Sequence, residues 1–598
     1  MPPFTDRLAS LRAALAAQGL DGFVVPLTDE HLSEYVGDYA QRLGWLTGFA
    51  GSAASAAVLA DRAAIFTDGR YTLQVREQVD GADWEYRPVP EDDVAAWLVR
   101  HAPAGARIGH DPWLHTRGWV AGTAAALAQV GAELVPVARN PIDALWTDRP
   151  APSPAPMRVH PDALAGRSSA EKRAAIGDWL EEQGADAVVI SALDSIAWLF
   201  NIRGSDVAHT PVALGWALVA ADGTAQLFTD PAKCTDDVRR HLGNAVAVLP
   251  EDAFAGALHG LAGRRVAADP DACVSAVLDA LSGATLVPAR DPVVLAKAIK
   301  HPAEIAGHRA AQLRDAAAMV RFLRWFEGAA PAGDLTEISA SDRLHAFRRD
   351  TGCLVDLSFD TISATGAHGA SPHYKATPES DAPIRPGELY LIDSGGQYFD
   401  GTTDITRVVP VTSATAEMRD RFTRVLRGHI AIATAVFPDG TPGGHIDGFA
   451  RRPLWEAGFD YAHGTGHGIG AFLSVHEGPQ RIASPLHPSG QALEPLRQDM
   501  LLSNEPGYYK PGEYGIRIEN LVLVESRPIA GGDSTMLGFE TLTHVPIERS
   551  LIVPGLLRAS ERAWLDDYHA RTLALLAPLL TQDEADWLAA KCAPLSEA

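Results

Sequence analysis

The sequence predicts an α/β protein built from several successive domains, and three observations support this. The first 300 residues contain the same series of helices and strands twice. The region after residue 300 begins with a long amphipathic helix and continues with alternating strands and helices. The chain has 598 residues, which is too long for a single hydrophobic core.

Each copy in the first half begins with a helical pattern followed by a buried strand. The helical patterns cover residues 8–18 and 171–183, and the strands lie in GLDGFVV (19–25) and GADAVVI (184–190). Each copy then has a Trp-Leu segment ending in Gly-Ser and a strand ending in Phe-Thr-Asp. These segments are WLTGFAGS and AAIFTDGR in one copy, and WLFNIRGS and AQLFTDPA in the other. Two copies are too few for a solenoid, so we expect duplicated α/β domains.

A proline-rich linker and the start of a long helix predict the domain boundaries. RPAPSPAP (149–156) is a proline-rich linker that continues neither a helix nor a strand. Residues 301–329 have apolar side chains at helical spacing, so a long helix opens the next region. We therefore predict four parts, listed as residues 1–150, 157–300, 301–540 and 541–598.

The third part alternates strand-like runs with helical stretches. The strands are predicted in LYLIDS (389–394), ITRVVPV (405–411), MLLSNEP (500–506) and IRIENLVLVE (516–525). The segment WLDDYHARTLALLAPLL predicts a terminal helix that packs on this part.

Bulk properties exclude some classes of function. The formal net charge of −24 argues against nucleic acid or an anionic membrane surface as the main partner. The four cysteines have no C-x-x-C spacing, which indicates thiols in a reducing compartment. The N-terminus lacks the apolar core of a signal peptide, and no apolar run approaches the roughly 18 residues of a membrane span. We expect a cytoplasmic protein.

Acidic residues recur at the ends of the predicted strands. Asp393 and Asp404 lie in DSGGQYFDGTTDITR, where a turn at Gly395-Gly396 would bring the two carboxylates together. Glu505 follows the strand MLLSNE. In IRIEN, alternation places Arg517 and Glu519 on one face, so the guanidinium can orient a carboxylate.

Four converging carboxylates repel one another unless cations neutralise them. A pair of divalent cations would do so, and an imidazole from HGTGHGIG (463–470) would complete the ligand set. Each residue alone has a simpler interpretation. An isolated Asp in a glycine-rich turn is usually a turn residue, and a Glu before Pro-Gly is usually exposed.

The segment HGTGHGIG also matches two other motifs in part. Its His-x-x-x-His pair lacks the helical Glu of the H-E-x-x-H zinc motif. Its GHGIGA satisfies the glycine pattern of a dinucleotide-binding turn, but the preceding residues are GFDYA instead of a buried strand. The nearest acid, Glu477, is still inside the same predicted loop instead of about 20 residues further on, so we reject the nucleotide interpretation.

The ordered motifs DSGGQYFDGTTDITR, HGTGHGIG, VHEGP, NEPGYY and GIRIEN closely resemble the aminopeptidase P (Xaa-Pro aminopeptidase) family. The resemblance covers nearly the whole chain, including WTDRP before the linker and the tail THVPIERSLI. It implies two creatinase-like N-terminal α/β domains, a "pita-bread" metallopeptidase domain and a C-terminal extension, as in the long cytosolic members.

The resemblance also assigns site residues. The implied metal ligands are Asp393, Asp404, His467, Glu505 and Glu519. Asp404 and Glu519 would bridge two ions. The implied catalytic residues are His373, His463, His476, Glu505 and Arg517. Of these, His476 would stabilise the oxyanion, Glu505 would shuttle a proton, and His373 and His463 would line the side of the leaving proline nitrogen.

The expected cofactors are two divalent ions per chain. Oxygen-dominated ligation with one imidazole favours Mn²⁺, with Co²⁺, Zn²⁺ or Fe²⁺ as alternatives. The implied substrates are peptides with proline in second position, and a homodimer is expected. Two other functions stay open: a prolidase-type Xaa-Pro dipeptidase, and a non-catalytic binding protein with the same fold.

Overall fold

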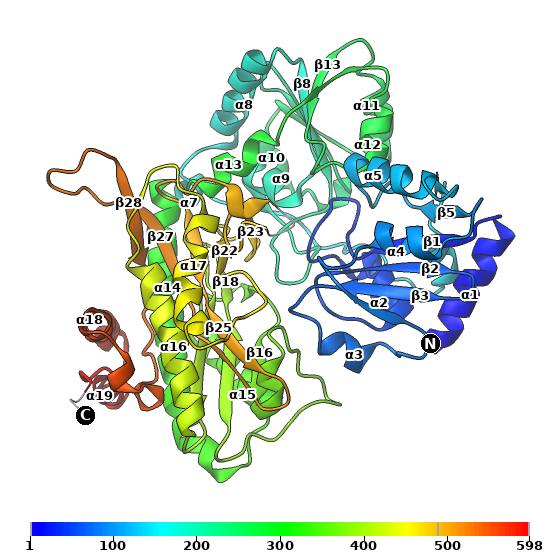
Figure 1. Ribbon diagram of the computed structural model, residues 1–598. Helices are drawn as coiled ribbons and strands as arrows, with labels where there is room; N and C mark the ends of the chain where they lie inside the picture. Colours follow the sequence, from blue (N-terminus) through cyan, green and yellow to red (C-terminus); the bar gives the residue numbers. More distant parts are fainter. Residues whose placement is uncertain (1–2, 487–489, 596–598) are drawn as a thin grey trace. The chain divides into compact units, whose positions relative to one another are not determined.

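A computed structural model describes residues 3–486 and 490–595 of the chain (Figure 1). The chain divides into two compact units. Unit 1 comprises Met1–Asp162 and Arg167–Val294, and unit 2 comprises Ala163–Gly166 and Leu295–Ala598. The extreme ends of the first and last predicted domains, residues 1–2 and 596–598, lie outside the described residues.

Unit 1 contains two six-stranded sheets with equivalent strand orders. The first, in spatial order, comprises β4 (Glu85–Pro88), β3 (Ala63–Thr67), β2 (Ala54–Leu59), β1 (Gly22–Pro26), β5 (Arg107–His110) and β6 (Glu133–Pro136). The second comprises β12 (Val246–Leu249), β11 (Ala225–Phe228), β10 (Trp216–Ala220), β8 (Ala187–Ile190), β13 (Arg265–Ala268) and β14 (Thr285–Pro288). The predicted duplication is confirmed.

The two copies also match in detail. The first strand of each copy, β1 or β8, pairs antiparallel with one neighbour and parallel with the other. The two Trp-Leu segments lie in helices, α2 (Arg42–Thr47) and α9 (Leu193–Phe200), which end at residues in the left-handed conformation, Gly48 and Asn201. The same left-handed backbone conformation therefore ends the equivalent helix in both copies.

Short helices and one small ribbon complete unit 1. The helices of the first copy are α1 (Phe4–Ala17), α3 (Gln74–Gln78), α4 (Val94–His101), α5 (Arg117–Ala128) and α6 (Pro141–Leu145). Those that follow the linker are α8 (Ser169–Gln183), α10 (Asp236–Leu242), α11 (Phe254–His259), α12 (Ser275–Ala280) and α13 (Pro292–Ala298), the last of which crosses into unit 2. The ribbon pairs β7 (Arg158–Val159) with β9 (Ile202–Arg203).

The described residues of unit 2 form four sheets, of six, three, three and two strands. The largest runs β21 (Phe437–Pro438), β28 (Met536–Thr541), β27 (Asn520–Ser526), β24 (Leu501–Asn504), β22 (Gly466–Gly468) and β23 (Glu477–Ile482). The others are β16 (Ile362–Thr365), β17 (Leu389–Ser394) and β20 (Ile405–Pro410); β15 (Asp356–Leu357), β18 (Gly396–Tyr398) and β19 (Gly401–Thr402); and β25 (Gly507–Lys510) with β26 (Tyr514–Arg517).

Long helices cover these sheets. They are α14 (Pro302–Ala329), α15 (Glu337–Arg349), α16 (Ala416–Ala433), α17 (Asp447–Trp455), α18 (Ala559–Leu576) and α19 (Gln582–Lys591). Leu576 of α18 and Leu588 of α19 share a buried cluster with Phe322 of α14. The predicted terminal helix therefore packs on this part of the chain as expected.

Two details differ from the predictions. The chain does not turn at Gly395-Gly396: it passes from β17 into β18 and reverses at Phe399-Asp400 instead. The run IRIENLVLVE is two strands, because the backbone of Ile518 donates to Pro506 O and that of Glu519 to Thr406 O. Both exceptions lie beside predicted site residues.

A short early segment of the chain belongs to unit 2. It comprises Ala163–Gly166, which is α7 (Asp162–Ala165) without its first residue, followed by Gly166. Gly166 has a φ of +73°, and a Cβ there would lie 1.9 Å from His301 Nδ1, so only glycine fits. Within residues 3–486 and 490–595, no helix combines the length and apolar character needed to cross a bilayer.

Candidate metal centre

Two paired strands hold the predicted aspartates. β17 and β20 run antiparallel, with Asp393 opposite Thr406, and Asp404 lies directly before β20. Gly395 allows the chains to approach here, because a Cβ on it would lie 1.9 Å from Thr403 O. Strand pairing, and not a turn at Gly395-Gly396, therefore brings the backbone segments of Asp393 and Asp404 side by side.

His467 lies at the centre of the short strand β22. Cβ atoms on the two flanking glycines would lie 2.0 Å from Ser503 O at Gly466 and 2.5 Å from Glu477 O at Gly468. The glycines therefore let β22 pack closely between β24 and β23. The His467 Nδ1–H donates to Gly468 O at 3.0 Å, so Nε2, which faces Asp404 and Glu505, is the candidate ligand atom.

Glu505 and Glu519 lie where β24 and β27 separate. We call this point the strand fork and define it by Asn504, Glu505, Glu519 and Asn520. Asn504 and Asn520 form the last pair of the ladder. Beyond it, the Glu505 N–H donates to Thr465 O at 2.7 Å and the Glu519 N–H to Thr406 O at 3.2 Å.

These strand ends bring the candidate ligands into one cluster. Ligand atoms of Asp404, His467 and Glu519 lie within 4.8 Å of one another, and all three residues are buried. His467 Nε2 lies 3.6 Å from Asp404 Oδ2 and 3.5 Å from Glu505 Oε1. Asp393 is buried nearby, and its Oδ1 has no hydrogen-bond partner among the described residues.

The cluster has an excess of negative charge. Burial and the Glu519 carboxylate raise the pKa of Asp404 well above its usual range, and burial and Asp393 do the same to the pKa of Glu519. Burial raises the pKa of Glu505 to about 7. Bound cations would offset the repulsion between these buried carboxylates. Carboxylate oxygens together with one imidazole nitrogen are suitable ligands for divalent metals. The residues therefore fit a metal centre.

Arg517 is the guanidinium of the cluster, and it differs in one respect from expectation. It pairs with Asp393, on the neighbouring sheet, and its Nε also lies 3.1 Å from Thr406 Oγ1. Thr406 in turn donates to Glu519 Oε2 at 2.7 Å. Arg517 therefore orients Asp393 directly and reaches Glu519 through Thr406.

The three other predicted histidines occupy different positions. The His476 ring centroid lies 4.3 Å from that of His467, at 67°. His463 is farther out: its Nε2 lies 2.8 Å from the Tyr509 hydroxyl, which accepts from Arg517 Nη1 at 2.6 Å. His373 follows Pro372, whose carbonyl accepts from Arg517 Nη2 at 3.2 Å. Arg517 therefore connects the segments of His373 and His463 to Asp393.

Sequence reasoning missed Thr406 and Tyr509. Thr406 stands two residues after Asp404, and the period of a strand would have placed the two on one face. Tyr509 lies in NEPGYY, where no feature distinguishes it from its neighbour Tyr508.

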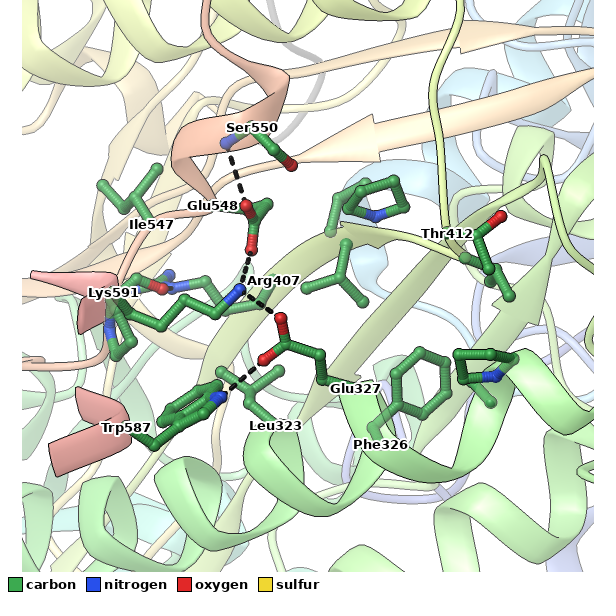
Figure 2. Close-up of a pocket in the computed structure, with 17 residues that line it drawn as sticks. Leu323, Phe326, Glu327, Arg407, Thr412, Ile547, Glu548, Ser550, Trp587 and Lys591 are labelled. Atoms are coloured by element: carbon green, nitrogen blue, oxygen red, sulfur yellow. Dashed lines mark hydrogen bonds and ion pairs between the residues drawn. The ribbon is translucent and has the colours of Figure 1, made fainter. Parts of the chain in front are cut away.

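Unit 2 also contains a separate cavity of about 250 Å³. Figure 2 shows Lys591 between Glu327 and Glu548, at 2.8 and 3.3 Å. Trp587 Nε1 donates to Glu327, and apolar residues of α14 and β20 form much of the wall. None of the candidate ligands lines this cavity, so the metal centre is the stronger candidate for chemistry.

Family models match most of the chain. Residues 306–526 match the model described as metallopeptidase family M24, and residues 535–595 match its C-terminal region. Residues 7–145 and 148–304 each match a creatinase/prolidase N-terminal domain.

Individual relatives are similar over nearly the full length. A "Probable Xaa-Pro aminopeptidase P" of Laccaria bicolor is 41% identical, with 99% of this chain and 94% of the relative covered. "Aminopeptidase P2" of Arabidopsis thaliana is 39% identical, with coverages of 99% and 89%. The crystal structure of an X-prolyl aminopeptidase of Caenorhabditis elegans, described as a cytosolic enzyme with a di-nuclear active site, has a TM-score of 0.95, 35% identity and full coverage of both chains.

Proposed function

We propose a mechanism for this chain, which belongs to the Xaa-Pro aminopeptidases of metallopeptidase family M24. It is a metal-dependent aminopeptidase that hydrolyses the bond between an N-terminal residue and a following proline. The observation that carries this function is the buried cluster of Asp404, His467 and Glu519, located within the M24 region.

The proposed ligands of two divalent ions are Asp393, Asp404, His467, Glu505 and Glu519. By resemblance to the family, Asp404 and Glu519 would bridge the two ions, and their buried ligand atoms lie within 4.8 Å of each other. When bound, a pair of divalent cations polarises the scissile carbonyl and acidifies a water. Mn²⁺ is the proposed metal, since four carboxylates and one imidazole provide mainly oxygen donors.

Glu505 is the proposed proton carrier. Its side chain is 17% exposed, compared with 5% for Asp404 and 6% for His467. This exposure lets the carboxylate exchange protons while the other ligands remain covered. It takes a proton from the attacking water and delivers one to the proline nitrogen, which has no N–H of its own and must gain a proton to leave.

The histidines act around this centre. His476, next to His467, donates a hydrogen bond to the oxyanion that develops on the scissile carbonyl. His463 and His373 are proposed to line the site of the proline ring. Arg517 supports both segments through Tyr509 and the Pro372 carbonyl, so it is proposed to fix their positions as well as that of Asp393.

We also propose the cellular setting and assembly. A cytoplasmic location agrees with the description of the Caenorhabditis elegans enzyme as cytosolic.

Trp455 and Phe449 of α17 are 51% and 46% exposed, which is unusual for large apolar side chains on one short helix. These residues support a homodimer through unit 2. Trp455→Asp should then convert a dimer, measured by light scattering at micromolar concentration, into a monomer.

The predicted boundaries are retained as a proposed four-part division, with the two N-terminal domains ending near residues 150 and 300. The family models change near the same positions, at 145–148 and 304–306.

Three peptides test the substrate assignment. Arg-Pro-Pro should release arginine rapidly, whereas Arg-Ala-Pro should be a poor substrate because it lacks the ring contacts at the second position. Acetylation of the α-amine of Arg-Pro-Pro should abolish turnover, since the free amine anchors the chain end near the carboxylates. Strong preference for the dipeptide Ala-Pro would instead identify a prolidase. Full activity after removal of metal would contradict the metal-dependent mechanism.

A further inference from the structure

His429 on α16 is a buried histidine that contacts the backbone on both sides of the strand fork. It has no solvent exposure. Its Nδ1 lies 3.1 Å from Asn504 O and 3.2 Å from Ile518 O. These two carbonyls belong to the residues that directly precede Glu505 and Glu519, so one ring atom bridges the segments carrying two candidate ligands.

The surrounding hydrogen bonds assign the tautomer of this ring. Asn520 Nδ2 lies 3.2 Å from His429 Nε2, which therefore accepts, and Nδ1 carries the proton that is shared by the two carbonyls. Asn504 Nδ2 also donates to the His429 carbonyl at 2.9 Å. Burial lowers the pKa of His429 to about 3, in agreement with a neutral ring.

The geometry of the strand fork explains why such a donor matters. Beyond the Asn504–Asn520 pair, Glu505 and Glu519 no longer bond to each other's strands but to Thr465 and Thr406. The ladder therefore does not set the distance between the two glutamates. His429 connects the strands at the point where they separate.

We propose that His429 is a positioning residue that sets the spacing of Glu505 and Glu519 and thereby the affinity of the site for divalent cations. The inference rests on the proposed metal centre. The ring touches the backbone before each glutamate and not the carboxylates, so its effect on cations is indirect. Outer hydrogen bonds of this kind typically change metal affinity by about 10–100-fold.

Two polar replacements separate positioning from simple packing. His429→Leu would leave buried carbonyls without a donor and risks unfolding the protein. His429→Asn places an amide N–H near the position of Nδ1 and retains the bridge, whereas His429→Gln places its amide near Nε2 and does not. The affinity for Mn²⁺ is measured on the folded full-length chain by competition with a fluorescent chelator.

We expect His429→Asn to stay within about 3-fold of the native affinity and His429→Gln to bind Mn²⁺ at least about 10-fold more weakly. The same two replacements at His569 are the matched control. This buried histidine on α18 accepts from the Ile547 N–H at 3.1 Å and lies outside the strand fork. Both His569 variants should retain the native affinity.

Equal Mn²⁺ affinities for His429→Asn and His429→Gln would overturn the inference, as would an equal loss in the His569 variants. If the native chain bound no Mn²⁺, the proposed metal centre itself would be wrong. These outcomes distinguish a failure of the positioning role from a failure of the proposed function.

Discussion

Unit 1 and unit 2 both bury acidic side chains, and one buried group in each unit shows two different ways of balancing the charge. In unit 1, Asp206 forms an ion pair with Lys233 at 2.7 Å, and both side chains are almost fully buried. In unit 2, Asp393, Asp404, Glu505 and Glu519 share one buried guanidinium, that of Arg517. The charges of the Asp206–Lys233 pair cancel, whereas the four carboxylates around Arg517 exceed its single positive charge.

The comparison separates structural charges from functional ones. A buried carboxylate is strongly unfavourable unless it has a partner of opposite charge. Lys233 meets this need within the chain, so Asp206 requires nothing further. The cluster lacks enough cationic side chains to meet this need, so its carboxylates repel one another until protons or cations from solution bind.

The largest expected effect comes from removing a bridging carboxylate. Asp404→Asn and Glu519→Gln should lose bound Mn²⁺ and peptidase activity together, because each side chain is proposed to contact both ions. Stability of the metal-free protein should not fall, since one repelling charge disappears. Elemental analysis and urea unfolding of chelated protein measure both quantities, and the native chain should hold two ions.

Asp206→Asn is the matched control from the balanced pair. It should leave the metal content unchanged but lower the free energy of unfolding by about 3–5 kcal/mol, because Lys233 is left as an unpaired buried charge. If Asp206→Asn lost metal, or Glu519→Gln kept both ions, the distinction between the two regions would fail.

A smaller effect is expected from the neutral part of the site. His476→Ala should keep both ions and lower kcat on Arg-Pro-Pro by about 10²–10³-fold, as removal of an oxyanion donor does. KM should change little, since the interaction forms mainly in the transition state. Loss of metal without loss of rate would show that His476 is a ligand and not a stabiliser.

The smallest effect concerns pH. The pKa of Glu505 is about 7 in the folded, metal-free chain and near its usual low value after unfolding. The folded state then holds this proton more tightly, so the free energy of unfolding should decrease as pH rises from about 4.5 to about 7. Urea titrations of chelated protein at several pH values measure the slope. Glu505→Gln should reduce it, and an unchanged slope would assign the effect to other groups.

The sequence predicted regular elements better than the points where they break. LYLIDS and ITRVVPV were located as strands within one residue, because apolar runs flanked by turn residues define them. IRIENLVLVE alternates throughout, yet it breaks at Ile518 and Glu519 because their N–H groups bond to Pro506 and Thr406. Such partners are distant in sequence, so no local pattern predicts them.

The site residues likewise divide into those that local motifs predict and those that only long-range contacts reveal. The five proposed ligands were named from motifs, and the structure brings Asp404, His467, Glu505 and Glu519 together, with Asp393 beside Arg517. His429 was not predicted, because a single histidine on an amphipathic helix resembles any other buried polar residue. Its role depends on where β24 and β27 separate, which only the fold specifies.

The early segment Ala163–Gly166 cannot reach its place in unit 2 until much later residues have been synthesised. It belongs to unit 2, yet about 135 residues lie between Gly166 and the His301 side chain that it packs against. At usual translation rates of about 5–20 residues per second, these residues take roughly 7–27 s to emerge. Most of unit 1 is therefore free to fold on the ribosome before His301, which contacts this short segment, has been synthesised.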